Sequence, residues 1–206
     1  MALQNGEDKV EDGSFSLKSL GLHDGKWVLL ILRVAACLAT ASATIVMALN
    51  KETKSFVIAT IGTTPLRATI TAKFYHTPAF VFFVVANGMA TIHNLAMILG
   101  NTFAQKLHGK GVLRLAIIAA ILDMMTVGLV SGGVNAAAFM AELGKNGNAH
   151  ARWDKICDKF DTFCDHAAGA LLASLLALLF LFIISAFSII KASNSIKYCS
   201  PLNVGG

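Results

Sequence analysis

Charged residues are scarce in this 206-residue chain. Asp, Glu, Lys and Arg make up 14% of it, against 55% hydrophobic residues and a mean hydropathy of +0.65. Soluble domains carry roughly a quarter charged residues. The stretches between the hydrophobic blocks are also too short to bury a soluble core of their own. The composition therefore indicates an integral membrane protein.

Residue sets that mark an enzyme or a metal centre are also missing. The six histidines are scattered without ligand spacing, so we expect no metal site and no cofactor. No nucleophile with a neighbouring base appears, which predicts a protein that is not an enzyme. The pI of about 9.1 comes from dispersed cations without interleaved aromatics. This distribution excludes nucleic acid as an expected partner.

What the chain does contain is four hydrophobic blocks, at 27–49, 79–100, 112–140 and 167–190. Each is long enough, at 1.5 Å per helical residue, to cross a hydrocarbon core of about 30 Å. The sequence predicts an all-α membrane fold, a four-helix transmembrane bundle over 27–190. The acidic head 1–26 is predicted to be a disordered tail, and 191–206 a short second tail.

The orientation depends on where the cations lie, because their number is balanced. Eight Lys and Arg fall in the head, second loop and tail, and eight in the first and third loops. Lys106, Lys110 and Arg114 stand in or beside a short loop without acids, which favours the cytosol. The third loop mixes four aspartates with its cations and carries two cysteines, which suits the outer face. Both termini are therefore predicted to be cytosolic.

Two charged residues lie inside the predicted spans, Arg33 in the first and Asp123 in the third. A charge in hydrocarbon costs at least about 3 kcal/mol on insertion scales. The two lie at similar depth from the cytosolic side, so we predict an Arg33–Asp123 ion pair that locks these spans together. Two alternatives stay open. Arg33 snorkels alone and leaves Asp123 without a partner, or Asp123 belongs to a proton or ion relay.

The second span carries polar residues at helical spacing. Asn87, Thr91 and Asn94 are four and three residues apart, so they share one face, with His93 at its edge. Such a face must point at protein. Interhelical hydrogen bonding is the first interpretation, and a polar pore or substrate track is the second.

Small residues recur every four positions in three spans, a spacing that lets helix backbones approach closely in lipid. The rows are Ala35, Ala39 and Ala43 in the first span, Gly128, Gly132 and Ala136 in the third, and Ala173 and Ala177 in the fourth. Each row either closes the bundle within one chain or, if it faces lipid, serves self-association. The spacing alone leaves both open.

The third loop carries Cys157 and Cys164, seven residues apart. On an outer face this pair predicts a disulfide, with two free thiols as the alternative. The aromatic side chains of Trp153, Phe160 and Phe163 are expected to pack beside it near the interface.

The first loop and the tail carry one further prediction each. Residues 56–61 and 66–74 are β-prone runs around a Gly/Pro turn, and they predict a short hairpin lying on the membrane surface. Cys199 follows the fourth span directly and is a candidate for palmitoylation.

The chain also carries a set of short motifs spread from the first span to the fourth. They are Arg33, Met47-Ala48-Leu49-Asn50-Lys51-Glu52-Thr53, Lys73-Phe74-Tyr75, Pro78-Ala79-Phe80, Phe83-Val84-Val85-Ala86-Asn87, Leu122-Asp123, Gly147-Asn148-Ala149-His150-Ala151-Arg152-Trp153, Ile156-Cys157 and Phe163-Cys164. Together they resemble the plant Casparian strip membrane protein-like family, which is itself similar to the MARVEL tetraspan proteins. The resemblance covers nearly everything except the head and the last residues.

This resemblance implies a multi-pass plasma-membrane protein with cytosolic termini that forms homo- and hetero-oligomers with related tetraspan proteins. Founding members assemble an immobile scaffold that marks where cell-wall enzymes deposit a lignin barrier. Their short, Phe-rich, acid-starting signature in the first outer loop does not match residues 61–77 here. We therefore expect the bundle to be retained and the outer recognition to be replaced.

The sequence thus predicts a non-catalytic plasma-membrane scaffold that self-associates laterally in the lipid bilayer, with cell-wall-modifying enzymes as expected partners. The alternative is a small channel or transporter whose polar path is lined by Asn87, Asn94, Asp123 and Arg33.

Overall fold

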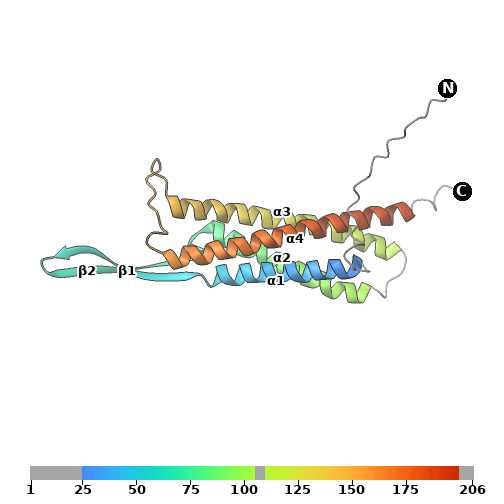
Figure 1. Cartoon of the computed structure of the whole chain (residues 1–206), viewed down its shortest axis with the longest axis horizontal. Helices are drawn as coiled ribbons and strands as arrows, with labels where there is room; N and C mark the ends of the chain where they lie inside the picture. Colours follow the sequence, from blue (N-terminus) through green and yellow to red (C-terminus); the bar gives the residue numbers. More distant parts are fainter. Residues whose placement is uncertain (1–24, 105–109, 200–206) are drawn as a thin grey trace, which may run out of the picture.

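The computed structural model describes residues 25–104 and 110–199. The predicted disorder of the N-terminal tail concerns residues that lie outside this part, apart from its last two. Along the chain the elements are α1 (Gly25–Ala48), β1 (Lys51–Ile61), β2 (Thr64–Lys73), the short 3-10 helix η2 (Phe74–His76), α2 (Pro78–Ala104), α3 (Lys110–Asn146) and α4 (Asp161–Cys199). They form an elongated helical bundle with a hairpin at one end (Figure 1).

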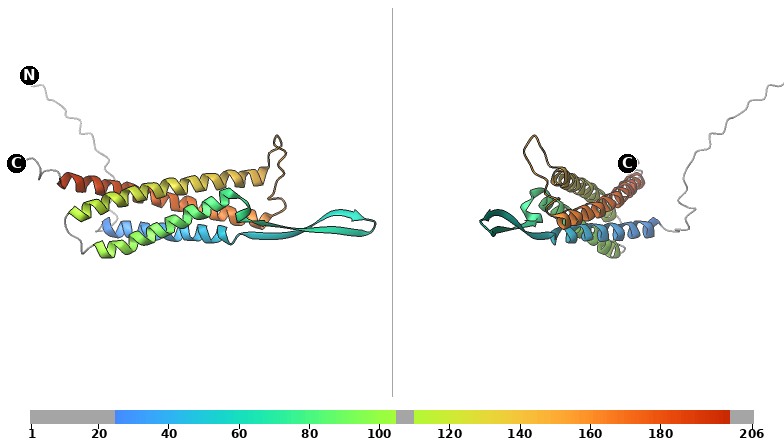
Figure 2. Two further views of the ribbon diagram at one scale, coloured as in Figure 1. Left: turned by 180° about the vertical axis from the view of Figure 1, so that it is seen from behind. Right: turned by 60° about the vertical axis from the view of Figure 1, so that its left-hand side comes forward.

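All four helices are long and apolar enough to cross a membrane, which confirms the predicted fold class. α1 and α3 each pack against both α2 and α4, so the helices follow chain order around the bundle (Figure 2). α3 and α4 run beyond the predicted spans at both ends. Hydropathy marks only the apolar stretch of a helix, whereas the helix itself continues through polar residues of good helix propensity.

Local signals account for two of the helix boundaries. Pro78 is the first residue of α2, where its missing N–H costs no hydrogen bond. Gly147 follows the last residue of α3 with φ +67° and donates its N–H to Leu143 O at 2.8 Å. A left-handed glycine is a common helix terminator. A Cβ at this position would lie 2.7 Å from Trp153 O, so the loop also requires glycine here.

Buried positions follow a heptad pattern in the helices. Those of α1 include Arg33, Ala36, Thr40, Ala43 and Met47, and those of α2 include Phe80, Phe83, Asn87, Ala90 and Asn94. The steps alternate between three and four residues. This period of 3.5 is the one at which left-handed bundles pack side chains of neighbouring helices into each other.

The four-residue rows of small residues do not form this seam. Ala43 and Ala177 are buried, but Gly128 and Gly132 are exposed, and Ala35, Ala39, Ala136 and Ala173 are half-buried. A strict four-residue step rotates about 40° around a helix each time. A row with a strict four-residue step therefore rotates away from the buried face of the helix, whose positions advance alternately by three and four residues.

Gly133 of α3, which the predicted rows did not include, lies in tight contact with α2. A Cβ at this position would lie 3.0 Å from Ala86 Cβ and 3.3 Å from Phe83 Cα. α2 and α3 can therefore pack this closely only because residue 133 has no side chain.

The predicted hairpin is present, and it is longer than the sequence indicated. β1 and β2 have 11 and 10 residues and pair in antiparallel register, with an irregularity between Val57 and Ala59. Gly62, with φ +64°, opens the two-residue turn, where positive φ favours glycine. The hairpin extends along the long axis of the bundle, away from the helix ends (Figures 1 and 2). We expected a hairpin lying on the membrane surface. Instead it continues the bundle axis (Figure 1), and its base contacts the start of α4.

Candidate functional site

One charged cluster joins all four helices in the bundle interior. Arg33 of α1 and Asp123 of α3 form two parallel hydrogen bonds, Nη1–Oδ1 at 3.0 Å and Nη2–Oδ2 at 2.6 Å. Their side chains are 1% and 2% exposed. The structure thus brings together the two charged residues that the sequence paired.

The other two helices complete the coordination of the Asp123 carboxylate. His93 Nε2 of α2 lies 2.8 Å from Oδ1, and Ser188 Oγ of α4 donates to Oδ2 at 2.5 Å. A carboxylate offers about four lone-pair positions, so Arg33, His93 and Ser188 fill them. Asn94 Oδ1 in turn accepts a long bond of 3.5 Å from Arg33 Nη1.

Sequence reasoning placed His93 only at the edge of a polar face and did not select Ser188. A usable signal exists for Ser188, because Ser174, Leu181 and Ser188 are spaced by seven residues and all lie on the buried seam of α4. A heptad pattern in the fourth span predicts that both serines face the other helices.

A second set of polar contacts crosses the bundle at Asn87 and Thr91 of α2. Ser174 Oγ of α4 donates to Asn87 Oδ1 at 2.7 Å, and the hydroxyls of Thr91 and Thr40 of α1 lie 2.8 Å apart. Asn87 and Asn94 are fully buried, and Thr91 is half-buried. The polar face of α2 therefore makes hydrogen bonds to α1 and α4.

A third contact clamps the start of α4 to the residues that follow α1. Asn50 Nδ2 donates to Phe163 O at 2.8 Å, and Glu52 Oε2 accepts the N–H of Phe163 at 2.7 Å. The first N–H groups of a helix lack partners within the helix, and negative charge is favourable there. Glu52 supplies both an acceptor and the charge, so the hairpin base caps α4.

The same side of the hairpin base carries two further contacts. Lys54 Nζ bonds Asp161 and also lies 3.0 Å from Glu52 Oε1. The hydrogen bond to Asp161, and after it the one to Glu52, raises the pKa of Lys54 above its usual value. The rings of Phe56 and Phe160 meet edge to face with centroids 5.8 Å apart.

Cys157 and Cys164 form a disulfide, as predicted, with Cα atoms 5.7 Å apart. It ties the third loop to the first turn of α4. Phe160 and Phe163 pack into the core beside it at 6% and 7% exposed, whereas Trp153 is 56% exposed. Trp153 instead holds the loop through its backbone, which exchanges two hydrogen bonds of 3.0 Å with Asn148.

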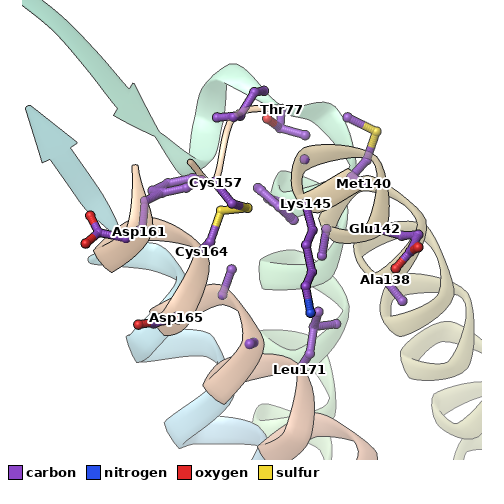
Figure 3. A pocket seen from close by; sticks show the side chains of 17 residues that line it. Thr77, Ala138, Met140, Glu142, Lys145, Cys157, Asp161, Cys164, Asp165 and Leu171 are labelled. Atoms are coloured by element: carbon purple, nitrogen blue, oxygen red, sulfur yellow. A yellow bond between two sulfur atoms is a disulfide. The ribbon is translucent and has the colours of Figure 1, made fainter. Parts of the chain in front are cut away.

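A cavity of about 420 Å³ lies beside this disulfide, between the C-terminal end of α3 and the N-terminal end of α4 (Figure 3). Its lining is mostly apolar and includes Phe80, Met140 and Leu171. The Lys145 side chain extends between the two helices (Figure 3). The volume falls in the range of about 300–1,000 Å³ seen for small-molecule sites. The polar residues of the bundle interior do not line it.

The model of the Casparian strip membrane protein domain matches residues 23–180. The chain belongs to the Casparian strip membrane protein family. It is 67% identical over 191 residues to CASP-like protein 1B2 of Populus trichocarpa, which covers 93% of each chain. It is 64% identical to CASP-like protein 1B1 of the same plant, over 93% of this chain and 95% of the relative. CASP-like protein 1B1 of Ricinus communis is 62% identical over 89% of each. No solved structure matches the chain.

Several residues of the motifs that carried the resemblance make contacts between elements of this CASP-like chain. Arg33 and Asp123 form the charged cluster, and Asn87 bonds α4. Asn50 and Glu52 hold Phe163. What these positions share is a polar side chain that reaches a different element of the fold.

Two cysteines of the CASP-like chain, Cys37 and Cys199, lie outside the disulfide. Cys37 is half-buried, and its Sγ lies 3.8 Å from Thr91 O. The side chain of Cys199 lies outside the described residues, so its palmitoylation stays a prediction. Within the described ranges, no group of three or more His, Cys, Asp or Glu is placed to hold a metal ion.

Proposed function

We propose that this CASP-like protein is a non-catalytic scaffold of the plasma membrane, with both termini cytosolic. It associates laterally with its own copies and with related tetraspan proteins. The observation that carries this proposal is the use of the buried polar groups. Asp123 has its acceptor positions occupied by Arg33, His93 and Ser188, one residue from each of the other three helices, which supports a role of this carboxylate in holding helices together.

The lipid-facing side of α3 supplies a surface for lateral association. Gly128 is exposed, and a Cβ there would meet nothing within 4 Å. Gly132 and Asn135 are exposed on the same helix, and Asn135 Nδ2 donates only within α3, to Ser131 at 2.9 Å. Small residues beside a polar amide favour close contact with another helix in lipid. We assign this face of α3 to contacts between bundles.

The outer loops present the recruiting surface of the scaffold. The hairpin projects well beyond the helix ends (Figure 1), and the disulfide holds the third loop next to its base. In this proposal the outer partners are cell-wall-modifying enzymes. The basis for naming them is the family to which the chain belongs.

A channel or transporter is the second candidate, with a path lined by Asn87, Asn94, Asp123 and Arg33. The contacts favour the scaffold, because these side chains bond to each other or to neighbouring helices. A conducting path needs polar groups that face a water-filled space. The cavity beside the disulfide lies apart from all four residues.

Photobleaching of a fluorescently tagged copy in the plasma membrane tests the scaffold. We expect slow recovery in a patterned domain for the wild type and faster recovery for Gly128→Leu combined with Asn135→Leu. Met125→Leu, at another exposed position of α3, is the matched control and should recover as slowly as the wild type. Fast, uniform recovery of the wild type would contradict the scaffold. Solute or ion flux through proteoliposomes would then support the channel.

A further inference from the structure

The hairpin has two faces with different surroundings. Residues Glu52, Lys54 and Phe56 point one way and contact Phe163, Asp161 and Phe160 at the start of α4. Side chains alternate between the faces of a strand, so the residues between these point the other way. On that second face the residues of β1, Lys51, Thr53, Ser55 and Val57, are exposed.

The register defines the residues of this second face, which we call the hydroxyl face. It consists of the cross-strand pairs Lys51↔Lys73, Thr53↔Thr71, Ser55↔Thr69 and Val57↔Arg67. The hydroxyls of Thr53 and Thr71 lie 3.0 Å apart, and those of Ser55 and Thr69 lie 3.1 Å apart. These distances show that each pair points to one side. The hydroxyl face is therefore a row of hydroxyls between cations.

The charges on this face are all positive. Lys51 and Lys73 stand directly opposite each other, an arrangement that destabilises a strand pair. Among the described residues, neither they nor Arg67 takes part in an ion pair. Like charges that weaken a fold and have no carboxylate partner within it are complementary to an anion from outside.

The spacing of the cations indicates a polymer. Lys73 and Arg67 are six residues apart on β2, which at strand rise is about 20 Å. A single phosphate or carboxylate cannot contact both ends of such a row, whereas an extended chain can. The hydroxyls between the cations match a chain that itself carries hydroxyls. Tyr75, 53% exposed, adds a ring face beside Lys73 Nζ, 5.3 Å from the ring centroid.

We infer that the hydroxyl face binds an acidic polysaccharide, a sugar polymer with carboxylates along its length. Lys51, Lys73 and Arg67 pair with the carboxylates, and the Thr and Ser hydroxyls bond the sugar hydroxyls. A bilayer surface is the less fitting anion, because the hairpin continues the bundle axis away from the helix ends (Figure 2). The inference rests on the proposed orientation, in which the hairpin is outside the cell.

The test uses the full chain in nanodiscs of phosphatidylcholine and polygalacturonate as the probe, measured by biolayer interferometry. We expect binding that weakens with salt and falls at least tenfold in the triple variant Lys51→Gln, Arg67→Gln, Lys73→Gln. The matched control removes the same charge from the third-loop side with Lys145→Gln, Lys155→Gln, Lys159→Gln and should bind like the wild type. Thr53→Val with Thr71→Val should weaken binding by a smaller factor and keep the salt dependence.

Folding and specificity have separate controls. Removing the opposed lysines relieves repulsion, so the triple variant should keep its Cys157–Cys164 disulfide and its thermal midpoint. Equal binding of fully methyl-esterified polygalacturonate, or equal losses in the two triple variants, would overturn the inference. So would unchanged polymer binding together with reduced attachment to phosphatidylglycerol vesicles, because the ligand would then be lipid.

The scaffold proposal and the polysaccharide inference can be tested independently. Absence of polygalacturonate binding by a wild type that still recovers slowly after photobleaching would refute this inference alone. An epitope inserted between Gly62 and Thr63 should be accessible on intact protoplasts. Accessibility only after permeabilisation would overturn the orientation and, with it, a polysaccharide as ligand.

Discussion

Arg33 Nη2 and Asp123 Oδ2 lie 2.6 Å apart in a cluster that side chains of all four helices reach. Because a buried charge without its partner is costly, the pair allows only those arrangements in which the two residues meet. The cluster therefore restricts the rotation and depth of α1 against α3, and His93 and Ser188 extend the restriction to α2 and α4.

Removing one residue of this pair should lower stability more than replacing both residues. We expect Arg33→Leu or Asp123→Leu alone to cost about 3–5 kcal/mol, because one charge is left buried and unpaired, while the double variant recovers much of the loss. Thermal midpoints in detergent, read by size-exclusion chromatography, measure this. Met124→Leu, beside Asp123 but 63% exposed, is the control. A double variant as unstable as the sum of the singles would show that the pair is not coupled.

The hydrogen bond from Ser174 to Asn87 should appear in a double-mutant cycle. Interhelical hydrogen bonds in membranes contribute about 0.6 kcal/mol on average and up to about 1.7 kcal/mol. We expect a coupling energy in that range for Asn87→Leu and Ser174→Ala, since both groups are fully buried. Ser42→Ala, whose hydroxyl is exposed and bonds only within α1, replaces Ser174→Ala in the control cycle and should show no coupling.

Two glycines of α3 should respond in opposite ways to alanine. Gly133→Ala places a methyl 3.0 Å from Ala86 Cβ and 3.3 Å from the Phe83 backbone, and overpacking of this kind costs about 1–3 kcal/mol. Gly128→Ala meets nothing within 4 Å and should be neutral or stabilising, because alanine has the higher helix propensity. The same thermal assay compares them. Equal losses at both positions would argue against the close packing of α2 on α3.

The disulfide should be closed and outside the cell. A membrane-impermeant maleimide applied to intact protoplasts should label Cys157 and Cys164 only after reductant is added. Cys157→Ser should lower stability by about 2–3 kcal/mol on the loop-entropy model for so short a ring. Cys37→Ser serves as the control for the loss of one cysteine. Labelling that requires both reductant and permeabilisation would place the third loop in the cytosol.

Hydropathy was sufficient for the number of helices, and the two stray charges indicated a contact between α1 and α3. The packing rows were only partly predictable. Gly128 and Gly132 fit a four-residue rule and are exposed. Gly133 begins an equally regular row with Ala137 and Ala141, and it is the one that packs tightly, because a Cβ there would lie 3.0 Å from Ala86 Cβ. A rule based on spacing cannot tell which face of a helix meets a neighbour. That choice depends on the register of the other helices.

The contacts between distant segments were predictable only where chemistry demanded a partner. An arginine and an aspartate inside hydrocarbon are each costly unless paired with an opposite charge, so the sequence was enough to predict their pairing. Glu52 and Phe163 are 111 positions apart. A glutamate in a loop or strand can simply face solvent, so the sequence did not predict that Glu52 caps a helix. The upright hairpin follows from that contact, which is why its direction was missed.

By itself the sequence determined four helices long enough to span a membrane, a buried ion pair, a disulfide and a hairpin, because each follows from the solvation of particular side chains or from local backbone preference. The tertiary structure decided which faces pack, that His93 and Ser188 join the charged cluster, and that the hairpin stands on α4. These depend on the mutual orientation of segments, and that orientation is set by side-chain volume and hydrogen-bond geometry summed over all four helices.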